Sequence, residues 1–513
     1  MMMDSQLPIL PVVLPLATGA VLLLLDVRRT TLKAVIGFAS IAAQLVVALG
    51  LTQLADAATP TVYALGNWHA PFGIVLVVDR LAAVMVLLTT LLGTAAHCYS
   101  LARWHGPGRF PVLLQFLLMG LNGAFLTGDL FNLFVFFELL LAASYGLALL
   151  GSGIARVRAS LHYIVVNLAA SLLFLIGVSL IYGVAGTLNM AQLAERIPAI
   201  AAADRALVES GAAILAIAFL VKAAVWPLGF WLPSTYAAAS APAAALFAIL
   251  SKVGIYAVLR LWLLFFDGQA GGEFLLYTGM ATMMFGAAGM LAAQRLGTIA
   301  AYSLVISSGT LLAAISRADA GVTAGALFYL VSSTLGAAAF FLLIELIQRA
   351  RPLGAEVLAV TAEQFGIDDE EPEESPGPAI PATMAILGLA FAACSLLLAA
   401  LPPLPAFLAK MSMISGLLSI RPIEGEAWVL LGLMLVCGLA ALVATARIGV
   451  SIFWAGGTSV PRVLFLEMVP VATLLILCAA LTIGAGPVTR YVQDAANSLH
   501  TPRAYVNAVL PRQ

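Results

Sequence analysis

Four ionisable residues lie inside long apolar segments of this sequence. Glu138 sits in "LFNLFVFFELLLAASYG" (130–146), and no other charged residue lies within six positions of it. Lys222, Lys252 and Lys410 occupy comparable places in later apolar segments. A charged side chain at the centre of a bilayer costs roughly 2.5–3.5 kcal/mol on insertion scales, so such residues usually have partners and a function.

A buried carboxylate that faces a lysine can move protons. When one member of the pair gains or loses a proton, the proton affinity of the other changes as well. We therefore predict that Glu138, Lys222, Lys252 and Lys410 form a proton path, with no catalytic residue and no enzyme activity. Two structural alternatives stay open, a hydrogen-bonded carboxyl at a helix interface for Glu138 and a lysine that snorkels to the interface for Lys222.

The composition indicates a membrane protein. The 513 residues are 62% hydrophobic and 10% charged, with a mean hydropathy of +1.06, whereas soluble domains carry about 25% charged residues. We expect a multi-pass protein of the plasma (inner) membrane, in contact with the lipid bilayer. The net charge of -1 gives no case for nucleic-acid binding.

No cofactor or metal site is predicted. The four cysteines lie far apart and make no metal-binding spacing, so we interpret them as small buried hydrophobic residues. All five histidines fall in loops, tails or segment ends.

The apolar segments predict an all-α fold with about fourteen membrane-spanning helices, because a span needs roughly 20 apolar residues. We place them at 9–26, 32–54, 73–98, 110–128, 131–150, 162–185, 208–231, 236–264, 273–293, 297–316, 320–347, 379–419, 427–453 and 463–485. The first lacks a preceding basic region, so we interpret it as a span and not a cleaved signal.

The distribution of basic residues predicts an orientation. With the N-terminus outside, twelve of the 24 Lys and Arg fall in inner loops and seven in outer loops or the tail. This bias favours N- and C-termini that both lie outside the membrane.

Two spans contain helix-breaking prolines. Span 7 reads "FLVKAAVWPLGFWLP" (219–233), and span 12 contains "LPPLPAF" (401–407). Broken helices at corresponding places in two halves are typical of transporters built from internal repeats. Because the two breaks lie five spans apart, we predict an internal duplication of five-helix units. The family resemblance given below implies that these units are spans 4–8 and spans 9–13.

Two other features have simpler interpretations. Asp79 and Arg80 are adjacent near the outer end of span 3, and we expect them to satisfy each other. The stretch 363–381 is acidic and rich in proline, which predicts a solvated cytoplasmic loop. We place this acidic loop at 352–378.

Three motifs resemble one superfamily: "GDLFNLFVFFELLLAASYGLALL" (128–150), the segment 221–260 around Lys222 and Lys252, and "LPPLPAFLAK" (401–410). They look like the antiporter-like subunits of respiratory complex I, membrane-bound hydrogenases and the Mrp-type multisubunit cation/proton antiporters. The length and "DLFNLFVFFELL" are most similar to the D-type subunits of the Mrp (Mnh or Pha) group.

The resemblance implies a role for each buried charge. Glu138 matches the span-5 glutamate, Lys222 the span-7 lysine, Lys252 the span-8 bridging residue and Lys410 the terminal lysine of span 12. The implied divisions are N-terminal spans in 1–105, proton-path units in 106–265 and 266–455, and a last span with the tail in 456–513.

Span 11 departs from the family pattern. Many relatives carry histidines and a lysine there, where this chain has Ser332, Ser333 and Ala337. A polar relay through Tyr302, Ser303, Ser332 and Ser333, with Ser307 and Ser308 nearby, is a candidate link between Lys252 and Lys410.

The resemblance implies a proton-translocating subunit of a multisubunit monovalent cation/proton antiporter, with Na⁺, K⁺ or Li⁺ as the exchanged cation and other subunits of that complex as partners. Two alternatives remain. One is a subunit of a redox-driven proton pump, of the NADH:quinone oxidoreductase or hydrogenase type. The other is a scaffold subunit that does not conduct.

Overall fold

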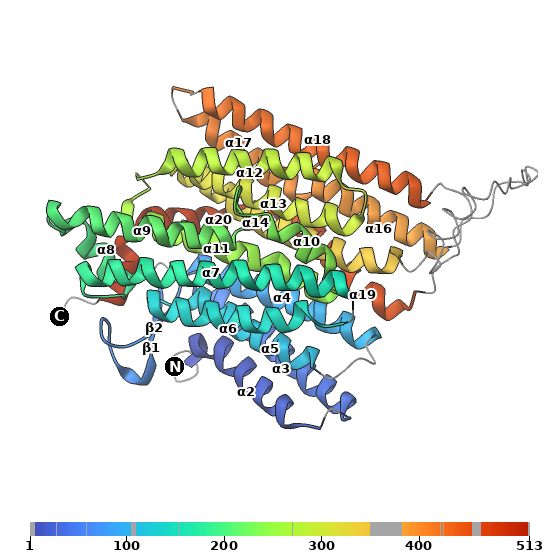
Figure 1. Ribbon diagram of the computed structural model, residues 1–513, viewed down its shortest axis with the longest axis horizontal. Coiled ribbons are helices and arrows are strands. Elements are labelled where there is room, and N and C mark those ends of the chain that lie inside the picture. Colours follow the sequence, from blue (N-terminus) through green and yellow to red (C-terminus); the bar gives the residue numbers. More distant parts are fainter. Residues whose placement is uncertain are drawn as a thin grey trace, which may run out of the picture.

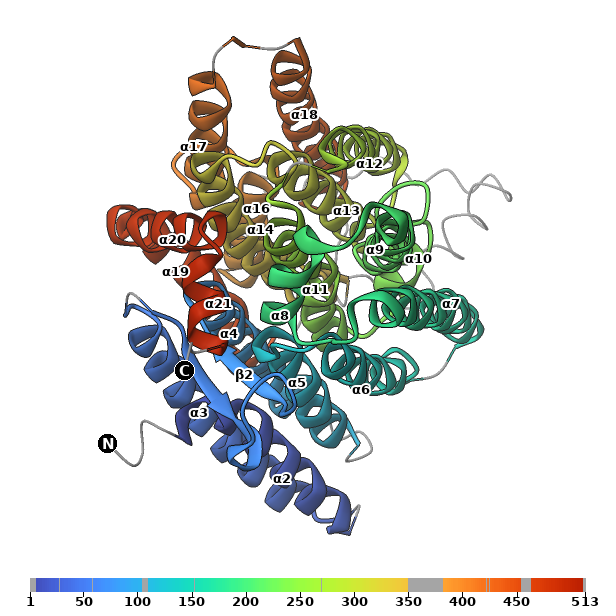
Figure 2. The same ribbon diagram turned by 90° about the vertical axis from the view of Figure 1, so that its left-hand side faces the viewer.

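The structure is a computed structural model that describes residues 6–510, apart from 27, 58, 104–108, 152, 269, 349–381, 421, 424 and 454–462. Long helices run side by side along one direction (Figure 1), and Figure 2 shows the same bundle seen along the helices. The acidic loop predicted at 352–378, and the acidic stretch 363–381 on which that prediction depends, lie outside the described residues.

The N-terminal part contributes three spans and a small hairpin. Its helices are η1 (Leu7–Ile9), α2 (Leu10–Leu24), α3 (Thr30–Leu54) and α4 (Arg80–Arg103), with η2 (Leu65–Asn67) in the connection. Strands β1 (Thr61–Ala64) and β2 (Val75–Val78) pair antiparallel, with Thr61 opposite Val78.

The prediction of a helix from residue 73 is therefore wrong, since the third span begins at Arg80. The β-branched residues Val75, Val77 and Val78 favour a strand. The carboxylate of Asp79 then accepts the N–H of Ala82 at 2.8 Å, which satisfies one free donor of the first helical turn.

The first five-helix unit follows. It comprises α5 (Phe110–Leu126), α6 (Leu130–Ala148), α7 (Ile154–Ala185), the pair α9 (Ala202–Lys222) and α10 (Trp231–Ala238), and α11 (Ala241–Phe266). The short helices α8 (Met190–Arg196) and η3 (Ile197–Ala199) connect α7 to α9. Helix α7 begins at Ile154, eight residues before the predicted 162, so Arg156 and Arg158 lie in its first turns.

The second unit has the same plan. It comprises α12 (Gly272–Ala292), α13 (Leu296–Ile315), α14 (Ala320–Gln348), the pair α16 (Ala382–Ala399) and α17 (Pro405–Ser419), and α18 (Gly425–Phe453). The chain ends with α19 (Phe465–Ile483), α20 (Ala485–His500) and α21 (Arg503–Val509). The sequence prediction named the residues of α20 and α21 only as the C-terminal tail.

The sequence predicts about fourteen spans. Within the described residues, twelve helices are long and apolar enough to cross a membrane. The 17-residue α5 is a shorter apolar helix, and the interrupted pair α9–α10 occupies the place of the predicted span 7. Helices α11 and α14 form the centre of the bundle, since nearly all of their residues are buried (Figure 2).

The two helix breaks have matching backbones. After α9, Ala224 takes a φ of 56°, and the N–H of Val225 bonds the carbonyl of Leu220 at 3.0 Å. After α16, Ala400 takes a φ of 54°, and the N–H of Leu401 bonds the carbonyl of Leu396 at 3.0 Å. Each helix thus ends in the same left-handed cap, which supports the related units that the sequence predicted.

Neighbouring side chains satisfy the backbone at the first break. The indole N–H of Trp231 donates to the carbonyl of Val221 at 3.1 Å, and the hydroxyl of Thr282 on α12 accepts the N–H of Trp226 at 2.9 Å. Non-helical backbone at membrane depth needs such partners. Pro227 lies in the break itself, while Pro233 lies in the first turn of α10, where its missing N–H costs little.

Candidate functional site

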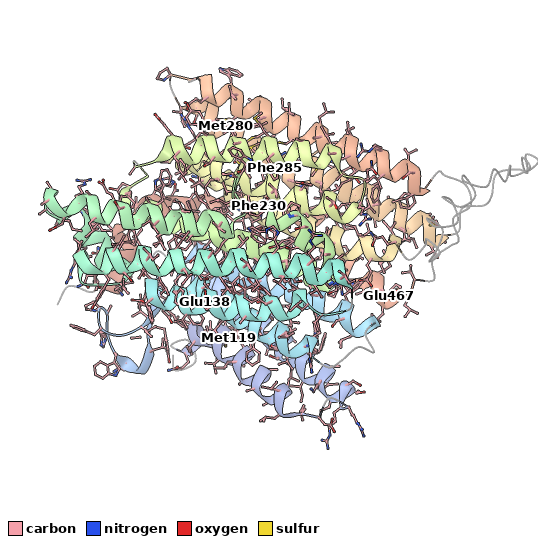
Figure 3. The ribbon with its side chains drawn as sticks, in the orientation of Figure 1. Met119, Glu138, Phe230, Met280, Phe285 and Glu467 are labelled. Carbon is pink, nitrogen blue, oxygen red and sulfur yellow. The ribbon has the colours of Figure 1, made fainter. Side chains whose placement is uncertain are left out.

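Glu138 lies near the middle of the length of the bundle (Figure 3), on α6. Its side chain is half-buried and accepts a hydrogen bond from the hydroxyl of Ser171 on α7. Helix α6 is fixed at its start by Asp129, whose carboxylate accepts the N–H groups of Phe131 and Asn132. The N-terminal cap therefore fixes the residue at which α6 begins.

Lys222 is the last residue of α9 and is 5% exposed. Its ammonium group donates to the Ser171 hydroxyl at 3.5 Å and lies 5.0 Å above the ring of Phe137. Ser171 therefore stands between Glu138 and Lys222, and no direct ion pair joins the two within the described part of the chain. The sequence prediction missed Ser171, because a serine in an apolar helix is not distinctive.

Lys252 on α11 is fully buried, and its ammonium group donates to the hydroxyl of Ser307 on α13 at 2.8 Å. Ser307 in turn lies 3.0 Å from the hydroxyl of Ser333 on α14. The three side chains form a continuous polar contact from α11 across α13 to α14.

Lys410 lies in the second turn of α17 and is 8% exposed. Its ammonium group is 5.8 Å from the ring centre of Tyr329 on α14. The phenol of Tyr329 interacts with the side chains of Ser307 and Thr310. Ser307 is thus a common neighbour of Lys252 and Tyr329, and Tyr329 connects this pair to Lys410.

Tyr329 lies in span 11, where the sequence analysis found no ionisable link. The signal that could have revealed it is a tyrosine one turn before Ser332 and Ser333 in an otherwise apolar segment. On a helix, residues three and four apart share a face, so Tyr329 and Ser333 are neighbours.

The predicted polar relay is only partly assembled. Ser333 joins the Lys252 contact, but the hydroxyls of Ser303 and Ser332 bond carbonyls of their own helices, those of Ala300 and Tyr329. Tyr302 points elsewhere, with its ring 5.9 Å from that of Phe285, which Figure 3 labels. Among the described residues, the buried hydroxyl of Ser308 has no hydrogen-bond partner.

The close packing of α11 on α9 brings Lys252 near the first break. A Cβ added to Gly254 would lie 2.5 Å from the carbonyl oxygen of Phe219 and 2.8 Å from the nitrogen of Ala223. Only glycine permits this approach, which is the usual role of small residues between membrane helices.

The prediction that Asp79 and Arg80 satisfy each other is wrong. Asp79 forms a buried ion pair of 2.8 Å with Arg260 on α11, while Arg80 pairs with Asp56 at 3.4 Å. The guanidinium of Arg260 also donates to the phenol of Tyr256 at 2.9 Å. Neighbours in sequence at the start of a helix point in different directions, so each side chain finds a distant partner.

Among the described residues, no group of three or more His, Cys, Asp or Glu side chains is placed to hold a metal ion. The arrangement offers instead one carboxylate, three lysines and the hydroxyls between them inside an apolar bundle. Hydroxyls both donate and accept hydrogen bonds. They can therefore pass a proton between groups that bind it.

The fold and these residues define a polytopic membrane protein with two antiporter-like helix units. Residues 127–437 match the family described as "NADH:quinone oxidoreductase/Mrp antiporter, TM". The chain belongs to this family, since the match covers more than half of it.

Similar proteins cover the full length. The chain is 55% identical to the D-type subunit of a probable K(+)/H(+) antiporter of Rhizobium meliloti (strain 1021), over 99% of this chain and 98% of the relative. It is 34% identical to the D-type subunit of the Na(+)/H(+) antiporter of Bacillus subtilis (strain 168), over 98% and 99%. A chain in the solved structure of the Mrp complex from Dietzia sp. DQ12-45-1b superposes with a TM-score of 0.84 at 27% identity, covering 99% of this chain and all of that one.

Proposed function

We propose that the chain is the proton-conducting, D-type subunit of a multisubunit monovalent cation/proton antiporter. The observation that supports this most is the series of contacts from Glu138 through Ser171 to Lys222, and from Lys252 through Ser307 and Tyr329 to Lys410. The relatives named above are subunits of such antiporters, which favours this function over a redox-driven pump or a scaffold.

In this proposal, Glu138 and Lys222 exchange protons through Ser171 in the first unit. Lys252 passes charge to the second unit through Ser307, and Lys410 is the last group of the path. The units correspond to 106–265 and 266–455, between the N-terminal spans in 1–105 and the last span in 456–513. Protons then cross by successive protonation of coupled groups, and the chain performs no covalent chemistry.

The exchanged cation that we propose first is K⁺. The relative at 55% identity is named as part of a probable K⁺/H⁺ antiporter, whereas the named Na⁺/H⁺ relative is 34% identical. We propose that the partners are the other subunits of the antiporter complex. Both ends of the described chain then lie on the outer side of the plasma membrane, as the distribution of basic residues predicts.

The test uses inverted membrane vesicles that contain the whole complex. A proton gradient is imposed with no NADH or quinone supplied, K⁺ and then Na⁺ are added, and a pH-sensitive dye follows the gradient. We expect K⁺ to collapse the gradient in wild type, and Lys222→Ala and Lys410→Ala to prevent the collapse. No response to either cation in an assembled complex would favour a redox pump, and full activity of both variants would favour a scaffold.

A further inference from the structure

Three tyrosines of the first unit extend the polar contacts of Glu138 toward one end of the bundle. Tyr145 follows Glu138 by two turns of α6, and its phenol interacts electrostatically with the Glu138 carboxylate. The ring of Tyr145 meets that of Tyr163 on α7 edge to face, with centroids 5.3 Å apart. The hydroxyl of Tyr163 lies 2.7 Å from that of Ser144. Polar groups therefore continue from Glu138 between α6 and α7.

Tyr236 on α10 continues this row of polar groups, which we call the seam. Its phenol interacts electrostatically with that of Tyr163. The ring of Trp231 contacts both tyrosines, with its centroid 5.1 Å from that of Tyr163 and 6.0 Å from that of Tyr236. Tyr236 is 1% exposed. The seam therefore passes from α6 across α7 to the inner half of the broken span.

The buried hydroxyls of Tyr145 and Tyr236 on this seam have no protein partner among the described residues, and neither has that of Ser240, two residues after the end of α10. Buried polar groups in proteins are nearly always hydrogen-bonded, either to protein or to ordered water. A site with several polar groups close together is the kind that holds water. Water is therefore the partner that these hydroxyls require.

Arg156 occupies the end of the seam. Its guanidinium donates to the carbonyl of Ala238, the last residue of α10, at 2.8 Å and to that of Leu150, after α6, at 2.6 Å. Gly151 has a φ of 104°, and a Cβ there would clash with the guanidinium. Glu345 on α14 also interacts electrostatically with Arg156.

We propose that Tyr145, Tyr163 and Tyr236 line a hydrated route through which protons reach Glu138 from the end of the bundle that carries Arg156. This inference rests on the proposed function, since it gives Glu138 its proton supply. Each water or hydroxyl accepts a proton on its oxygen and releases its own to the next group. The route is therefore balanced and needs no co-reactant. The competing interpretation is an aromatic core whose hydroxyls have no role.

The first experiment removes hydroxyls and keeps the rings. The double variant Tyr163→Phe with Tyr236→Phe is compared with Tyr182→Phe, a 53% exposed tyrosine on the same α7. Cation-dependent proton exchange is measured in vesicles that hold the assembled complex. We expect the double variant to lose about tenfold or more in rate, because a positioned proton-transfer group contributes at least that much, and the control to match wild type. An unchanged rate in the double variant would overturn the route.

A second measurement tests whether water reaches the seam and does not depend on transport activity. In the variant Ser240→Cys, the new thiol is offered a membrane-impermeant maleimide from each side in turn, with wild type as the blank for the four native cysteines. We expect labelling from the Arg156 side and none from the other. No labelling from either side would refute a hydrated route.

The exchange rate of Glu138→Gln in the same vesicles distinguishes a failure of the route from a failure of the proposed function. If it abolishes exchange while the double tyrosine variant stays fully active, the route is wrong and the proposed function stands. If Glu138→Gln itself exchanges normally, the proposed function fails first.

Discussion

Lys252 donates a hydrogen bond of 2.8 Å from its buried ammonium group to the hydroxyl of Ser307. The same serine contacts Ser333 and interacts with Tyr329, beside Lys410. The two lysines thus lie at opposite ends of a series of neutral hydroxyl groups. The hydroxyls between them come from α13 and α14.

Replacing Ser307 should interrupt this connection. We expect Ser307→Ala to slow cation-dependent proton exchange about tenfold or more, because it removes a hydroxyl that interacts with both Lys252 and Tyr329. Ser303→Ala is the matched control, since that hydroxyl bonds its own helix. Equal rates in the two variants would show that protons bypass Ser307.

Tyr329 should matter through its hydroxyl. Tyr329→Phe keeps the aromatic face beside Lys410 but removes the contacts with Ser307 and Thr310. We expect a severalfold lower exchange rate with normal assembly, whereas Tyr302→Phe, outside the cluster, should match wild type. Dye-based exchange assays on both variants test this, and a silent Tyr329→Phe would remove Tyr329 from the path.

Asp79 should be a stability residue. Asp79→Asn leaves the buried guanidinium of Arg260 without its counter-charge, and such a loss costs about 3–5 kcal/mol. We expect a clearly lower unfolding temperature of the purified complex or poor assembly. Asp56→Asn, which breaks the exposed pair with Arg80, should cost about 0–1 kcal/mol. Thermal denaturation of both variants would contradict this account if they unfolded alike.

Gly254 should tolerate no side chain. We expect Gly254→Ala to separate α11 from α9 near Lys222 and to lower both stability and exchange, because the added Cβ would lie 2.5 Å from a backbone oxygen. Gly432→Ala on α18 is the control, since nothing lies within 4 Å of a Cβ there. If Gly254→Ala were as stable and as active as Gly432→Ala, the close packing would not be needed.

Much of the fold and the charged part of the site could be predicted from the sequence. Glu138, Lys222, Lys252 and Lys410 are local signals, because charge in an apolar run is rare whatever the tertiary structure. The prolines near Lys222 and before Lys410 revealed both helix breaks, since proline cannot continue a helix freely.

The partners of these residues could not be predicted in the same way. Ser171 and Tyr329 are neutral residues of ordinary apolar helices, and only helix packing brings them to the lysines. Asp79 pairs with a residue 181 positions away, while its charged neighbour Arg80 offered a simpler local pairing. The strand at Val75–Val78 was missed because a short apolar strand beside a span cannot be told from the span by hydrophobicity.

The most direct test of the proton path is the exchange rate of Glu138→Gln, measured with a pH-sensitive dye in inverted vesicles that hold the assembled complex and receive K⁺. The matched control is Glu209→Gln, which changes an exposed glutamate of α9 that pairs only with Arg205 in the described structure. We predict that Glu138→Gln abolishes the K⁺-dependent collapse of the proton gradient and that Glu209→Gln leaves it at the wild-type rate. A wild-type rate in Glu138→Gln would contradict the account, because protons would then cross without the carboxylate on which the path depends.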